Sequence, residues 1–144
     1  MSERPDPEKH SDLVAELLDI FQQEQFEILG VSGGMGYPEP LALENDGFGD
    51  QEEKEPDIYA FDKTKKRYII GEAKTGSGDF ETEHALTQYN VFLDQVNKRN
   101  GQRAFLYVIV PSSRVAEFNS FITHYIHREY WGSFVLVSSK RWVE

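Results

Sequence analysis

The sequence contains no cysteine. Disulfide bonds, thiolate metal sites and a cysteine nucleophile are therefore excluded. Long apolar runs are also missing, because the longest one, from Ala104 to Val110, is far shorter than the roughly 20 residues that span a bilayer. The first residues, Met1 to Pro5, lack the apolar stretch of a secretory signal. We therefore expect a cytoplasmic protein that does not enter membranes.

Basic residues are scarce: 15 Lys and Arg stand against 25 Asp and Glu, for a net charge of −10. The imbalance is uneven, since residues 1–62 hold 17 acidic and 3 basic residues (−14) and residues 63–144 hold 8 and 12 (+4). The basic second half leaves room for a local positive surface on an acidic protein. The length of 144 residues indicates a single domain, residues 1–144.

Hydrophobic periodicity predicts an alternation of helices and strands. Leu13, Val14, Leu17 and Phe21 recur at helical spacing, and Ala104 to Val110 reads as a buried strand. The expected elements are a helix over 7–25, strands over 26–32, 57–62 and 67–74, a helix over 80–98, a strand over 103–110, a helix from 112 or 113 to about 127, and a strand over 133–138. A long acidic loop occupies residues 34–55. This order, α-β-β-β-α-β-α-β, predicts a three-layer α/β/α sandwich with a mixed central sheet.

The expected hairpin carries a group of charged residues at one end. Glu72 and Lys74 are two positions apart on a strand, so they project from the same face. Fourteen residues separate Asp57 from Glu72, and a turn near Lys63–Lys66 would bring Asp57 opposite the Glu72–Lys74 end. Two carboxylates with a backbone carbonyl and water suit Mg²⁺ or Mn²⁺, which activates water and polarises phosphoryl oxygens. The adjacent ammonium can stabilise charge on a phosphate.

Pro56-Asp57 followed by Glu72-Ala73-Lys74 resembles the PD-(D/E)xK motif of the restriction-endonuclease-like nucleases. By motif layout the nearest members are the Holliday-junction-resolvase and VRR-type nucleases. The resemblance extends from the N-terminus to Val110 and implies a Mg²⁺-dependent endonuclease. It implies Asp57, Glu72 and the Ala73 carbonyl as metal ligands and Lys74 as the catalytic, base-like residue.

Members of this superfamily often carry two further site residues. One is a glutamine on the crossover helix, and Gln88, next to Tyr89, occupies that place. The other is a carboxylate on the first helix, for which Glu16 is the first choice and Asp12 the alternative. The basic residues Lys65, Lys66 and Arg67 at the hairpin tip are candidate contacts to nucleic acid.

The histidines are weaker candidates. His124 and His127 could clasp a transition metal but have no third ligand at a convincing spacing, and His84 is read as a solvated helix residue. The leading hypothesis is a DNA nuclease, for which we expect a homodimer that cuts both strands. The alternatives are a catalytically silent binding module of the same fold and an interaction protein that uses the acidic loop.

Overall fold

A computed structural model describes residues 7–44, 53–76 and 83–144, and it has the expected α/β sandwich architecture with a five-stranded mixed sheet. The strand order is β1-β4-β5-β6-β7. The bounds of these strands are Glu27–Val31 (β1), Ile58–Asp62 (β4), Arg67–Ala73 (β5), Phe105–Val110 (β6) and Phe134–Ser138 (β7). The pairs β1–β4 and β4–β5 are antiparallel, whereas β5–β6 and β6–β7 are parallel.

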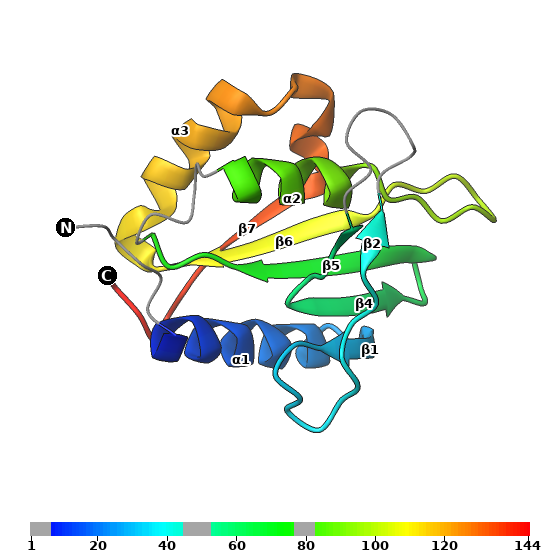
Figure 1. Cartoon of the computed structure of the whole chain (residues 1–144), viewed down its shortest axis with the longest axis horizontal. Coiled ribbons are helices and arrows are strands. Elements are labelled where there is room, and N and C mark those ends of the chain that lie inside the picture. Colours follow the sequence, from blue (N-terminus) through cyan, green and yellow to red (C-terminus); the bar gives the residue numbers. More distant parts are fainter. Residues whose placement is uncertain (1–6, 45–52, 77–82) are drawn as a thin grey trace.

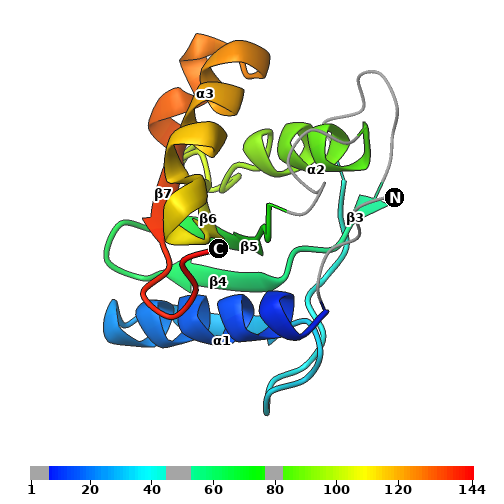
Figure 2. The ribbon, with the colours of Figure 1, turned by 90° about the vertical axis from the view of Figure 1, so that its left-hand side faces the viewer.

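Helices cover both faces of the sheet (Figure 1, Figure 2). Helix α1 (Pro7–Gln23) lies on one face, and α2 (Glu83–Leu93) and α3 (Val115–Tyr125) lie on the other. Strands β5, β6 and β7 succeed one another in a single direction across the sheet, so two crossovers of the same hand place both connecting helices on the same side.

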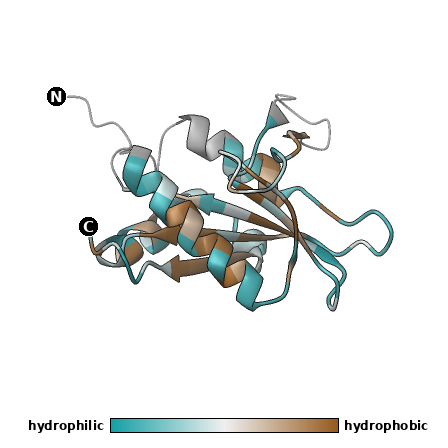
Figure 3. Ribbon diagram, turned by 90° about the horizontal axis from the view of Figure 1, so that it is seen from below, coloured by the Kyte–Doolittle hydropathy of each residue, from teal (hydrophilic) through white to brown (hydrophobic). Residues whose placement is uncertain are grey.

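The apolar stripe of α1 forms the core on its face of the sheet. Leu13, Leu17 and Phe21 are fully buried against β4, β5 and β6. In Figure 3, which views the molecule from the side of α1, the strands are largely brown and α1 itself changes between teal and brown. Helix α1 comes especially close to β5 at Gly71, where an added Cβ would lie 3.0 Å from Leu17 Cδ2 and 3.1 Å from Phe21 Cζ.

The second helix is shorter than the 80–98 that we expected. It ends at Leu93, and Val96 then forms a bridge with Arg103. The cause is Asn97, which is buried and whose backbone N–H and C=O bind Gln102 and Gly101 within this turn. The expected start of the helix, residues 80–82, lies outside the described part of the chain.

The segment 34–55, which we expected to be a loop, contains two short strands. Its ends pair as β2 (Leu43–Glu44) and β3 (Glu53–Lys54), and Leu43 is buried in the core beside α2. Residues 45–52 lie outside the described residues. The third helix is preceded by a short 3₁₀ turn, η1 (Ser112–Arg114), and followed by a second one, η2 (Arg128–Ser133). None of the described helices has the length and apolar character needed to cross a bilayer.

Candidate active site

Asp57 and Glu72 meet where β4 begins and β5 ends. The register pairs Ile58 with Gly71, so the next residues outward, Asp57 and Glu72, face each other. The Asp57 backbone N–H donates a hydrogen bond to Glu72 Oε1 at 3.0 Å. The N–H of the next residue on β5, Ala73, donates to Asp57 Oδ2 at 2.9 Å. The sequence-based expectation that the hairpin brings these two carboxylates together agrees with the geometry.

The Ala73 carbonyl lies on the same side of β5 as Asp57. In a strand, the N–H and C=O of one residue point toward the same neighbouring strand. The Ala73 N–H points to Asp57, whereas the N–H of the next residue, Lys74, donates to the Ile109 carbonyl of β6 at 3.0 Å. Since β4 begins only at Ile58, no strand residue of β4 lies opposite Ala73. The carbonyl oxygen is therefore a third oxygen donor on this side.

Glu72 is buried, with 3% of its side chain exposed, and its pKa is raised well above the usual 4.5. Burial is the largest cause, because it removes water from the charged form. The negative charge of Asp57 also raises the pKa, whereas the Lys74 ammonium and the hydrogen bond from the Asp57 backbone lower it. With both carboxylates ionised, the pair would carry more negative charge than the Lys74 ammonium balances, and this opposes ionisation of Glu72.

Lys74 is held between Glu72 and helix α2. Its Nζ lies 3.7 Å from Glu72 Oε2 and donates a 2.8 Å hydrogen bond to Gln88 Oε1. The ammonium also lies 5.5 Å from the centre of the Tyr89 ring. The side chain of Lys74 is 7% exposed, so its position is determined by these three neighbours. The structure thus brings Gln88 into the site, where the resemblance implied it.

The α1 residue that reaches the pair is His10, which sequence reasoning missed. Its Nε2 lies 3.2 Å from Asp57 Oδ2. A signal was present, because His10 stands three and four positions before Leu13 and Val14 and thus extends the buried stripe of α1 by one turn. A polar residue at the end of an apolar stripe is a reason to look for a site beside it.

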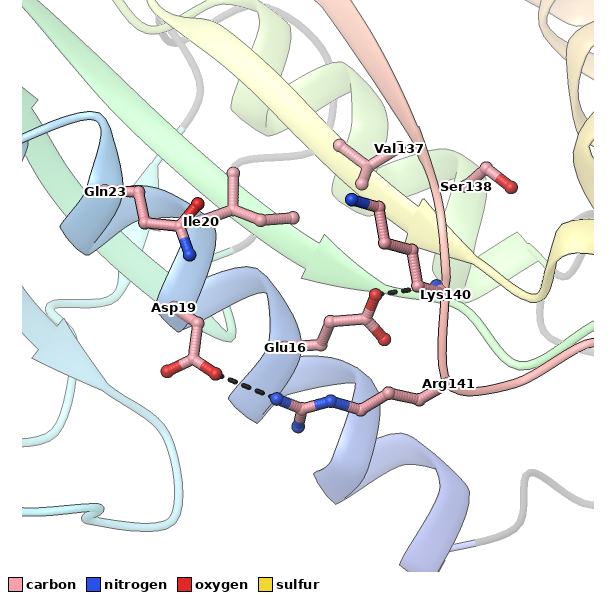
Figure 4. Close-up of a pocket in the computed structure, with 8 residues that line it drawn as sticks. All are labelled: Glu16, Asp19, Ile20, Gln23, Val137, Ser138, Lys140 and Arg141. Atoms are coloured by element: carbon pink, nitrogen blue, oxygen red, sulfur yellow. Dashed lines mark hydrogen bonds and ion pairs between the residues drawn. The ribbon is translucent and has the colours of Figure 1, made fainter.

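Glu16, the acidic residue that we favoured on the first helix, does not join this site. Its Oε1 accepts a hydrogen bond from Ser139 Oγ at 2.7 Å and its Oε2 accepts one from the Lys140 N–H at 2.8 Å. Glu16 lines a groove of about 230 Å³ between α1 and the segment after β7, where Arg141 also reaches Asp19 (Figure 4). The alternative, Asp12, accepts from Trp142 Nε1 at 3.2 Å. Both carboxylates hold the C-terminal segment, for which the helix pattern offered no partner.

A further carboxylate, Glu55, lies near Asp57, and Glu39 lies beside Glu55. Glu39 accepts a hydrogen bond from the Gly33 N–H at 3.2 Å. The pKa of Glu55 is raised, first by burial, then by a hydrogen bond with Glu39 and the charge of Glu39, and finally by the charge of Asp57. Glu55 therefore adds negative charge beside Asp57, and Glu39 adds it beside Glu55, which increases the attraction of this edge for a cation.

The remaining candidates lie elsewhere. Lys65 and Lys66 are exposed at the hairpin tip, at the opposite end of β5 from Glu72, and the Arg67 guanidinium lies 4.2 Å from the centre of the Phe105 ring. His127 Nδ1 accepts from the Glu129 N–H at 3.2 Å, and the His124 ring packs against Tyr125. The His84 side chain lies outside the described residues.

The donor chemistry of the Asp57–Glu72 pair fits a hard divalent cation. The charged form of Glu72 is disfavoured by burial and by Asp57, and a cation between the carboxylates would relieve both effects. In the described part of the chain, no three His, Asp or Glu side chains converge as a ready-made metal cluster. Mg²⁺ does not require one, because it is commonly held by one or two carboxylates, with water and substrate phosphate completing its shell.

No family model, curated protein or solved structure matches this chain. The residues of the site are therefore the basis on which a function is inferred.

Proposed function

We propose that this protein is a divalent-metal-dependent nuclease that hydrolyses phosphodiester bonds, with DNA as its substrate, in the cytoplasm. The observation that carries the proposal is the juxtaposition of Asp57 and Glu72 with the buried Lys74 ammonium at one strand end. Asp57, Glu72 and the Ala73 carbonyl would hold Mg²⁺ or Mn²⁺. When bound, such an ion polarises a phosphoryl oxygen and lowers the pKa of a water molecule.

Lys74 and Gln88 supply the remaining polar groups. The Lys74 ammonium, fixed by Glu72 and Gln88, is a preorganised donor for the charge that develops on the phosphate in the transition state. Lysine only donates hydrogen bonds, so the Gln88 oxygen must face Lys74. The Gln88 amide N–H groups then remain to orient a phosphate oxygen or a water molecule.

His10 is the residue that the structure adds to this scheme. Its contact with Asp57 Oδ2 fixes the carboxylate from the α1 side, while the Ala73 N–H fixes it from β5. For cleavage of both strands of a duplex, we propose a homodimer that presents two such sites.

A binding module without catalysis is the second candidate. One observation favours it: Asp57 Oδ2 already contacts both the Ala73 N–H and His10. A metal would have to share or displace these contacts.

The test is calorimetric titration of Mg²⁺ and Mn²⁺ together with cleavage of single-stranded, branched and duplex DNA. Asp57→Asn should abolish both metal binding and cleavage. Lys74→Met should retain metal binding and lower cleavage by at least about 100-fold, since a preorganised donor to developing charge is worth about 10²–10³ in rate. Asp19→Asn, which removes one exposed carboxylate from α1, is the matched control and should behave as the wild type.

Failure of the folded wild-type protein to bind either metal would refute the nuclease proposal. Metal binding without cleavage of any of these DNAs would favour the binding module.

A further inference from the structure

Two basic segments that are far apart in the sequence meet at the other end of the sheet. The side-chain amides of Asn97 and Asn100 both donate to the Lys66 carbonyl, each at 2.9 Å. These bonds join the β4–β5 hairpin tip to the turn that follows α2. In Figure 1 both segments lie at the right-hand end of the molecule, away from the end of β5 that carries the candidate active site.

A groove of about 340 Å³ opens beside this junction, which we call the hairpin groove. It is lined by Glu27, Leu29, Phe61, Tyr68, Asn97 and Arg99.

The aromatic side chains of the hairpin groove form a corner. Tyr68 is stacked on Tyr59, with ring centres 5.3 Å apart and planes 5° apart. Phe61 meets Tyr68 edge-on at 5.0 Å and 67°. Leu29, 38% exposed, adds an apolar wall. A planar ring entering this corner would contact one aromatic face and one aromatic edge at once, which is a favourable arrangement for stacking.

The charge around the hairpin groove is positive. Arg99 lines it, and Lys63, Lys65, Lys66 and Lys98 are exposed on the two joined segments. Two carboxylates oppose these five cations: Glu27, 3.3 Å from Lys63, and Asp62, which accepts from the Thr64 and Lys65 N–H groups. The balance is +3 on a chain whose net charge is −10. A polyanion is therefore the ligand that this surface favours.

We propose that the hairpin groove binds single-stranded nucleic acid outside the active site. Phosphates would contact Arg99, Lys65 and Lys66, and one base would stack in the corner formed by Tyr68 and Phe61. An acidic peptide could satisfy the cations but brings no planar ring for the corner, whereas every nucleotide brings a phosphate and a π-face.

The proposal rests on the proposed function in one respect, because it takes nucleic acid as the substrate. Tyr68 of the groove and Glu72 of the candidate active site are four residues apart on β5, which is about 13 Å at the rise of a strand. The hairpin groove would thus hold the strand at a distance from the bond to be cut.

The test titrates the protein into a labelled 12-nucleotide oligothymidylate and measures its fluorescence anisotropy. EDTA is present, so that binding is observed without cleavage. The double variant Lys65→Gln/Arg99→Gln should bind about tenfold more weakly. Its slope of log K against log salt should be smaller by about 1.4, or 0.7 for each lost phosphate contact. Phe61→Leu should bind at least about fivefold more weakly, through loss of stacking.

Matched controls are available in the same chain. Lys140→Gln removes one exposed cation and Tyr125→Leu one exposed aromatic ring, both outside the hairpin groove, and both should bind as the wild type. Thermal melting of every variant checks that it is folded.

Unchanged binding by folded Phe61→Leu, or equal competition by polyglutamate and unlabelled oligothymidylate, would overturn the proposal. The binding assay contains EDTA and so does not depend on a metal at the active site. Asp57→Asn should therefore lose cleavage and still bind oligothymidylate, which tests the active site separately from the hairpin groove. Normal cleavage without groove binding would refute the hairpin groove alone.

Discussion

The contact between α1 and β5 at Gly71 positions the candidate active site, and its contribution can be measured with Gly71→Ala. The new methyl carbon would lie 3.0 Å from Leu17 Cδ2, 3.1 Å from Phe21 Cζ and 3.2 Å from Ile58 Cβ. The first two neighbours are the ends of side chains and can move by a few tenths of an ångström. Ile58 Cβ belongs to the adjacent strand and cannot move without disturbing the sheet.

This geometry corresponds to moderate overpacking, for which we expect a loss of about 2 kcal/mol in the free energy of unfolding. In a chain of this length, that loss lowers the melting temperature by roughly 4–8 °C. Relief of the clash also moves α1 away from β5, which lengthens the 3.2 Å contact of His10 with Asp57.

Urea and thermal unfolding in EDTA provide the assay, and Gly132→Ala is the matched control. An added Cβ at Gly132 meets no atom within 4 Å, and its φ is not in the left-handed region, so this substitution should be neutral or slightly stabilising. Unfolding of Gly71→Ala at the same urea concentration as Gly132→Ala would refute a tight approach of α1 to β5.

Two further predictions concern buried carboxylates. Because the pKa of Glu72 is raised in the folded state, the protonated carboxyl stabilises the fold below about pH 4.5, and this stabilisation is lost as the pH rises through the raised pKa. In EDTA, the free energy of unfolding of the wild type minus that of Glu72→Gln should thus decrease with rising pH, by at most about 1.4 kcal/mol per pH unit for one proton; a difference that does not vary with pH would contradict the assignment. Glu16→Ala should lower stability by about 2–3 kcal/mol, because Ser139 Oγ and the Lys140 N–H lose a charged acceptor, and should speed proteolysis of the C-terminal segment. Asp19→Ala, which breaks only an exposed ion pair with Arg141, should cost less than about 1 kcal/mol, and equal effects of the two substitutions would contradict the role of Glu16.

Local patterns in the sequence were sufficient for most of the fold. The apolar stripe of α1 and the continuous apolar run of β6 each identify an element without tertiary information, because the helix buries one face and the central strand buries both. Element ends were less predictable. Helix α2 stops at Leu93 because buried Asn97 binds the backbone of the following turn, and a helix propensity cannot anticipate such a contact.

The residues of the candidate active site likewise fall into those that the sequence pattern places together and those that it does not. Asp57, Glu72 and Lys74 lie on the two arms of one hairpin, so spacing and strand alternation alone place them together. Residues from the helices depend on how each helix docks against the sheet. His10 reaches Asp57, whereas Glu16, six positions further along α1, reaches Ser139 and Lys140.

The sequence by itself therefore determined the α/β class, the carboxylate–lysine hairpin and the scarcity of positive charge. Only the tertiary structure decided which α1 residue joins the site, and only it united the basic segments around Lys66 and Arg99 into one surface. The physical reason is the distance along the chain between the residues in contact. Spacing specifies contacts within an element or between paired strands, whereas contacts between distant segments depend on the docking of whole elements, which the packing of the core sets.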